Sequence, residues 1–253
     1  MTFVDQLAFW EATLLIGAVL LGYVGFTAFW AMRHNDAEGL KSVFRGAAAP
    51  VGGVGAVATM LGVWSEAAWP LPGSYNILFT DIYLLFGLTL VMLAISMAAS
   101  LKLQYAGLLG LVAGGVTIAY GWQGYQLGMT KEPLQMFLLY GAFGLAGILS
   151  FPATVVADYY LAHPDGTAFA LRSGVAVARR RPSIQAATRG VQPVVPTDAS
   201  GTPDPAMSVR TTFHLPIYIS ATLLVFVVSM ALAGIAALFF MDSTLPAHLA
   251  YAP

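Results

Sequence analysis

Six long stretches of mostly apolar residues constrain this chain more than any other feature of its sequence. A helix needs about 20 such residues to cross the roughly 30 Å hydrocarbon core of a bilayer. The stretches therefore predict an all-α membrane protein with six transmembrane helices, at residues 7–32, 47–68, 77–99, 104–127, 134–158 and 214–240. Composition agrees, because 58% of the 253 residues are hydrophobic and only 9% are charged, too few to cover a water-facing surface.

The positive residues between these stretches predict the orientation of the chain. Cytoplasmic loops of membrane proteins carry an excess of Lys and Arg. Of the 11 Lys and Arg residues, all except Lys131 follow the first, third or fifth stretch. With an even number of spans, this asymmetry predicts that both termini lie outside the cell.

Residues 162–212 form the one long polar stretch. It is rich in Pro, Ser, Thr, Arg and Ala, and it has no aromatic residue between Phe169 and Phe213. Such a segment cannot bury enough apolar area to offset the entropy cost of ordering. We predict one long disordered cytoplasmic loop inside a single transmembrane domain, residues 1–253. The run from Arg179 to Arg181 serves there either as a topology determinant or as a contact to anionic lipid headgroups.

Three carboxylates fall near the outer ends of the first three spans. A charge at the centre of a span costs roughly 2.5–3.5 kcal/mol on insertion scales, so acidic residues in spans call for a reason. One interpretation is an outward-facing acidic pocket that binds a substrate or ion, built from Glu11, Glu66, Asn76, Asp81 and Gln123. The other is an ordinary membrane interface, where Trp and Tyr form a belt and carboxylates reach out to water.

At the inner ends of spans one, five and six, four residues are weak candidates for metal ligands: His34, Asp158, His163 and His214. Imidazole and carboxylate suit zinc, copper or iron, but no two of these residues have ligand spacing on one helix. A His at a helix C-terminus is also favoured by the helix dipole alone. The chain has no Cys and no recognisable catalytic motif, so we predict no cofactor and no catalytic residue.

Glycines recur at helical spacing in the fourth and fifth spans. The positions are Gly110, Gly114, Gly124, Gly128, Gly141, Gly144 and Gly147. Faces of this kind let helices approach closely, which indicates a compact bundle, a homo-oligomer or docking of partner membrane subunits. Membrane lipids are the other expected partners, whereas a net charge of −1 gives no basic field for nucleic acid.

Three segments together resemble a known family: SYNILFTDIYLLFGLTLV at Ser74–Val91, the Thr-x-x-Pro of Thr130–Pro133, and LLYGAFGLAGILSFPA at Leu138–Ala153. They are similar to a prokaryotic membrane-protein family catalogued as domain of unknown function 981, over about residues 47–160. The resemblance implies a multi-pass protein of the prokaryotic plasma membrane with unassigned activity, and it supplies no catalytic residues.

Three functional hypotheses follow from these observations. The first is a non-enzymatic transporter or channel-like protein for a small solute, proton or cation. In it, protonation or ion occupancy of Asp81 and Glu66 is coupled to rearrangement of the glycine-rich fourth and fifth spans. The alternative is a non-catalytic accessory or scaffold subunit of a larger membrane complex, for example a respiratory one. The third is a metal-dependent membrane redox enzyme that uses the inner histidines.

Overall fold

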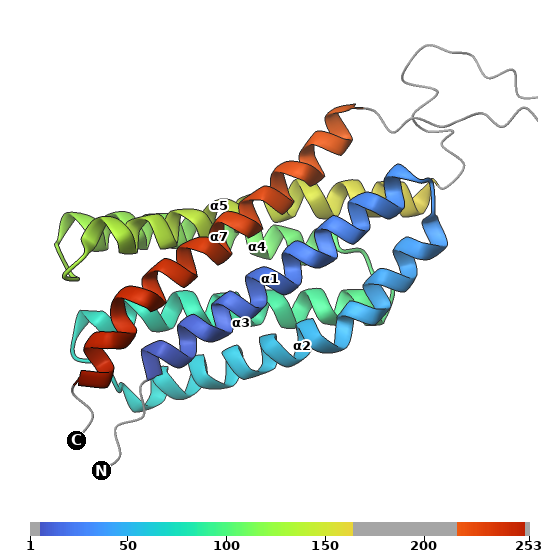
Figure 1. Cartoon of the computed structure of the whole chain (residues 1–253). Helices are drawn as coiled ribbons and strands as arrows, with labels where there is room; N and C mark the ends of the chain where they lie inside the picture. Colours follow the sequence, from blue (N-terminus) through green and yellow to red (C-terminus); the bar gives the residue numbers. More distant parts are fainter. Residues whose placement is uncertain (1–5, 164–216, 251–253) are drawn as a thin grey trace, which may run out of the picture. The chain divides into compact units, whose positions relative to one another are not determined.

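The computed structural model describes the backbone of residues 6–163 and 217–250, and side chains at 7–163 and 221–242. In these ranges the regular elements are all helices (Figure 1): α1 (Gln6–Arg33), α2 (Ala37–Ala68), α3 (Ser74–Ala98), α4 (Gln104–Gln126), α5 (Pro133–Ala162) and α7 (Ile217–Ala250). They belong to one compact unit, Met1–Pro164 with Leu215–Pro253. Nearly all of the loop predicted at 162–212 lies outside the described residues.

The prediction of six membrane-spanning helices is confirmed. Each predicted stretch is a helix, and six helices of the described chain are long and apolar enough to cross a membrane. The helix α7 ends at Ala250, ten residues beyond its predicted end, and α2 begins at Ala37, ten residues before its predicted start at residue 47. The extra turns of α2 are amphipathic, with Leu40 and Phe44 buried while Lys41 is exposed, and Asp36 accepts a hydrogen bond from Gly39 N at 2.7 Å. A search for lipid-length apolar runs misses such a capped extension.

The six helices contact one another in a closed ring. The principal contacts join α1 to α2, α2 to α3, α3 to α4, α4 to α5, α5 to α7 and α7 back to α1. Consecutive helices run in opposite directions, so that α1 begins and α7 ends at the same end of the unit (Figure 1). This agrees with the even number of spans, while the side of the membrane on which that end lies stays a prediction.

In each of two hairpins of the ring, the two helices pack so closely that only glycine fits at their contact. In α4 and α5, a Cβ added to Gly114 would collide with the carbonyl oxygen of Gly144 and lie 2.7 Å from Ile148 N. In α2 and α3, a Cβ on Gly87 would lie 2.5 Å from Thr59 N. The glycines of α4 and α5 at positions 110, 114, 144 and 147 thus serve the compact bundle. Their neighbours in the same chain occupy the space beside these four glycines, whereas nothing lies within 4 Å of a Cβ added to Gly128 or Gly141.

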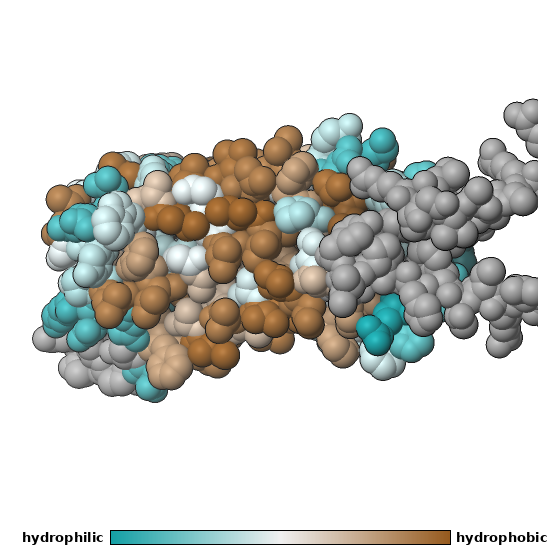
Figure 2. Space-filling model, turned by 90° about the horizontal axis from the view of Figure 1, so that it is seen from above, coloured by the Kyte–Doolittle hydropathy of each residue, from teal (hydrophilic) through white to brown (hydrophobic). Residues whose placement is uncertain are grey.

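Apolar side chains cover the middle of the unit. Figure 2 shows brown residues over the central part of the visible face, with teal residues gathered toward its two ends. Large exposed hydrophobic residues occur on every helix, including Tyr23, Met60, Tyr105 and Phe239. A surface of this kind is stable in lipid and not in water, so contact with membrane lipids follows directly.

The glycine contact can be tested with two neighbouring residues. We expect Gly114→Ala to lower the free energy of unfolding in detergent by about 1–3 kcal/mol, because the new methyl group meets backbone atoms that cannot move aside. The control is Gly115→Ala, where no atom lies within 4 Å of the added Cβ. Thermal unfolding followed by circular dichroism compares them, and equal stability of the two variants would contradict the packing described above.

Candidate functional site

Glu66 and Asp81 come together at the end of the unit where α2 ends and α3 begins. Glu66 lies in the last turn of α2 and Asp81 lies two turns into α3. Their carboxyl groups are close enough to interact electrostatically, and both residues are half-buried. Oε1 of Glu66 is buried without a hydrogen-bond partner among the described residues. Two of the five predicted binding residues thus form one acidic pair.

Tyr120 of α4 completes this group. Its Oη donates a hydrogen bond of 2.7 Å to Oδ2 of Asp81, which links the acidic pair to the glycine-rich hairpin. We call Glu66, Asp81 and Tyr120 the acidic triad. Sequence reasoning missed Tyr120, although Trp122 and Gln123 beside it already placed this part of α4 at the same depth as the carboxylates.

Asn76 and Gln123, two other predicted binding residues, lie outside the acidic triad. Asn76 is fully buried in the first turn of α3, where Nδ2 donates to Ser65 O and Oδ1 accepts from Leu71 N, each at 3.3 Å. These bonds satisfy backbone groups at the end of α2, a structural task. Gln123 is exposed, three residues beyond Tyr120 toward the end of α4.

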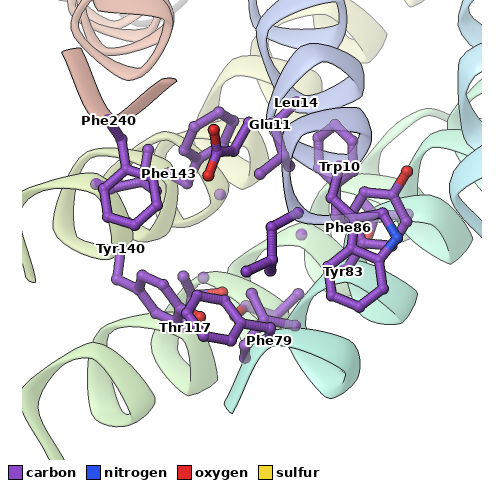
Figure 3. A pocket seen from close by; sticks show the side chains of 18 residues that line it. Trp10, Glu11, Leu14, Phe79, Tyr83, Phe86, Thr117, Tyr140, Phe143 and Phe240 are labelled. Carbon is purple, nitrogen blue, oxygen red and sulfur yellow. The ribbon is translucent and has the colours of Figure 1, made fainter. Parts of the chain in front are cut away.

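Glu11 lines a separate, partly open space. It is only 5% exposed and lines a cavity of about 110 Å³ between α1, α3, α4, α5 and α7, which we call the outer cavity. Figure 3 shows aromatic side chains around it, including Trp10, Phe79, Tyr83, Tyr140 and Phe143. Trp10 stacks on Tyr83 with ring centroids 5.3 Å apart. Glu66, Asp81 and Tyr120 are not among its lining residues, so the structure divides the predicted acidic pocket into a cavity and a triad.

A second cavity of about 130 Å³ continues the first toward the other end, and we call it the inner cavity. Both are lined by Phe86, Thr89, Gly110, Phe143 and Gly147. Phe86 and Phe143 meet edge to face at their boundary, with centroids 6.1 Å apart. Along α1 the lining runs from Leu7 to Met32, which at about 1.5 Å per residue is about 37 Å. The ring of helices therefore encloses two cavities in line.

The residues predicted as weak metal candidates lie at the opposite end from the triad. Asp158 caps α4, because its two carboxylate oxygens accept from Leu103 N and Gln104 N at 2.9 and 2.8 Å. Nδ1 of His34 and of His163 each hydrogen-bonds the carbonyl oxygen four residues earlier in the chain. Among the described residues, no three His, Cys, Asp or Glu side chains form a group that could hold a metal. His214 lies outside the described residues.

A family model described as protein of unknown function (DUF981) matches residues 1–172 of this chain. The chain belongs to the DUF981 family. The match includes Glu11, the acidic triad and helices α1–α5, so the DUF981 region contains most of the ring. No curated protein and no solved structure matches the chain.

The structural role of Asn76 can be tested by comparing it with the exposed residue Gln123. We expect Asn76→Ala to lower the free energy of unfolding by about 1–3 kcal/mol, because Leu71 N loses its acceptor and Ser65 O keeps only the hydrogen bond from Trp69 N. Gln123→Ala is the control, since its side chain is exposed and should change stability by less than about 0.5 kcal/mol. Thermal unfolding of both purified variants gives the answer, and an unaffected Asn76→Ala protein would rule out the structural role.

Proposed function

We propose that this protein is a transporter of the carrier type, which moves a small solute through the interior of its helix ring. The observation that carries this proposal is the pair of cavities in line inside a closed ring of six membrane-spanning helices. Their combined length of about 37 Å is comparable to the roughly 30 Å hydrocarbon core. A purely structural subunit has no need for an enclosed space of this extent.

The boundary between the cavities acts as the barrier of the proposed carrier. Phe86 of α3 and Phe143 of α5 face each other there, and a Cβ on Gly17 of α1 would lie 2.6 Å from the tip of the Phe86 ring. The Phe86 ring is thus held between α1 and α5. A rotation of either aromatic side chain, or a small shift of α5, would join the two cavities.

The acidic triad is the proposed site of proton coupling. Two neighbouring carboxyl groups repel when both are ionised, so the pair can hold one proton between them. When the pair loses that proton, the two negative charges repel, and Asp81 changes its interaction with Tyr120 of α4. Since α4 and α5 move as one close-packed hairpin, proton loss at the triad would shift the wall that carries Phe143.

The accessory-subunit hypothesis has less support. Its main argument was the glycine-rich faces of α4 and α5, and most of these glycines are occupied within the chain. In the transporter hypothesis, the same glycine contacts hold α4 and α5 together, so that the two helices move as one part.

The absence of cysteine makes the access pathway straightforward to test. We expect Thr117→Cys, in the outer cavity, and Ser150→Cys, in the inner cavity, to react with a membrane-impermeant maleimide from opposite sides of oriented vesicles. Val112→Cys, on the exposed face of α4, is the lipid-facing control and should stay unlabelled. If neither cavity position reacts from either side under any pH gradient, the carrier proposal is wrong.

The same vesicles test the coupling. If the triad couples protons to transport, the labelling of Thr117→Cys relative to that of Ser150→Cys should change with pH. We expect Asp81→Asn to abolish that change. Glu132→Gln, an exposed residue outside the triad, is the matched control.

The shared proton can be observed independently by infrared spectroscopy. We expect the wild-type protein to show a carbonyl stretch of a protonated carboxylic acid at neutral pH that both Glu66→Gln and Asp81→Asn remove, since either change removes the neighbouring carboxylate whose repulsion favours the shared proton. Glu11→Gln assigns any separate signal from the outer cavity. Persistence of the same band in both triad variants would contradict proton sharing.

A further inference from the structure

The inner cavity offers a ligand no charge and no side-chain hydrogen-bond donor. Of its lining residues that the structure describes, none is charged, and only Thr89, Ser150 and Thr154 are polar. The Thr89 hydroxyl donates to Leu85 O at 2.8 Å, and the Thr154 hydroxyl donates to Ser150 O at 2.9 Å. The hydroxyl of Ser150 donates to Gly147 O at 2.6 Å. Each of these donors is therefore already used inside its own helix.

The inner cavity is long and narrow. On α1 its lining runs from Ala18 to Met32, and on α5 from Phe143 to Ala157, which is about 21 Å on each helix at about 1.5 Å per residue. Its volume of about 130 Å³ is close to that of an engineered apolar cavity of about 150 Å³ that stays dry and binds benzene. A volume sufficient for one such ring, drawn out over this length, suits a single hydrocarbon chain.

The inner cavity also has the extent of a lipid chain in one leaflet. It runs from Phe86 and Phe143, inside the ring, to Met32 and Phe44, near the end of α1 and the start of α2. The chains of one leaflet fill half of the hydrocarbon core, about 15 Å of its roughly 30 Å. From this lining and this shape we infer that the inner cavity binds the hydrocarbon chain of a neutral single-chain lipid.

The binding site itself does not depend on transport, whereas the same lipid as the transported solute rests on the proposed function. A neutral head group follows if the whole molecule passes through the ring. A charged head group would lose its water in the inner cavity without gaining a counter-charge.

Polar solutes fit the inner cavity less well. An ion would lose its hydration, and a sugar or amino acid would bury several polar groups where sites for such ligands normally provide convergent polar partners. A hydrocarbon chain has no such cost. It also gives the side chains of Leu21, Leu93 and Met97 the van der Waals contacts that lining atoms lack beside an unfilled space.

Photolabelling of the full chain in nanodiscs tests this inference. The probe is hexadecanol with a diazirine near the end of its chain, and mass spectrometry locates the adducts. We expect adducts on inner-cavity residues such as Phe86 and Leu90, which an excess of unlabelled hexadecanol reduces about tenfold by mass action. Adducts on the exposed residues Val19 and Val112 should not fall, because contact with bulk lipid is not saturable. Inner-cavity adducts that are missing, or that hexadecanol does not reduce, would overturn the inference.

Two further competitors test shape and polarity. Adamantanol is an apolar cage that cannot extend along the cavity, and hexadecanediol would bury a second hydroxyl group at the far end of its chain. We expect each to compete about tenfold more weakly than hexadecanol, because one fills the space poorly and the other buries an unpaired polar group. Equal competition by either molecule would overturn the inference.

Variants of α4 then locate the site. Ala106 lines the inner cavity alone, and Ala113, two turns further along the same helix, lines the outer cavity alone. We expect Ala106→Leu to reduce the competed labelling about tenfold, because its side chain fills the space, and Ala113→Leu to leave the labelling of Leu90 unchanged. Unchanged labelling of a folded Ala106→Leu protein would count against the site. If that variant does not fold, Ala28→Leu fills the inner cavity from α1 and is judged in the same way.

Thr89→Val tests whether a hydroxyl group recognises the ligand. The change keeps the shape of the side chain and removes a hydroxyl that is bonded to Leu85 O. We expect the competed labelling to match that of the wild type. A loss of about tenfold in a folded Thr89→Val protein would show recognition by hydrogen bonding and contradict an apolar site.

These measurements separate the two proposals. Competed photolabelling of the inner cavity without any maleimide labelling of Thr117→Cys or Ser150→Cys would leave the lipid-chain site standing and remove the carrier. Opposite-sided maleimide labelling without competed photolabelling would leave the carrier standing and exclude this substrate class.

Discussion

Close backbone contact through glycine is the constraint on which the rest of this structure depends. Where Gly114 meets Gly144, and where Gly87 meets Thr59, the helix backbones lie too near each other for even a methyl group. Lipid provides no hydrophobic force to press helices together, so close van der Waals packing has to hold the hairpins α2–α3 and α4–α5. Small residues at these contacts leave larger side chains, such as Phe86 and Phe143, to meet inside the ring at the boundary of the two cavities.

Polar groups near the ends of the helices divide into two kinds. Asn76 and Asp158 satisfy backbone groups that the helix ends leave open, and these bonds account for their burial. The acidic triad is different, because it joins three helices through side chains alone and satisfies no helix end. Glu11 differs again, as it lines the outer cavity. The acidic triad and Glu11 are therefore better candidates for a functional role than the polar residues that cap helix ends.

Sequence reasoning predicted the six helices, their approximate bounds and the depth of the carboxylates, because apolar length and charge placement depend on the membrane alone. It could not predict which way each side chain points. The spans are apolar on all sides, so periodicity does not identify an inward face. For this reason Glu11 and Asp81 were expected in one pocket, whereas the rotation of α1 and α3 separates them. In the sequence, Tyr120 was indistinguishable from the aromatic residues of the membrane interface. A capping residue such as Asp158 resembles a metal ligand until the backbone N–H groups that it binds at the start of α4 are known.

Separation of the triad from the outer cavity determines what kind of coupling the proposed carrier can have. If a proton and the transported solute competed for one group, exchange would follow from simple displacement. Here the two sites are distinct, so coupling requires a conformational change that both ligands bias. Two helices are placed to transmit it: α3 carries Asp81 next to the cavity residue Ile82, and α4 carries Tyr120 one turn from the cavity residue Thr117. The hydrogen bond between Tyr120 and Asp81 crosses the contact between these two helices, so a change at the triad is passed directly to α4, one turn from the wall of the outer cavity.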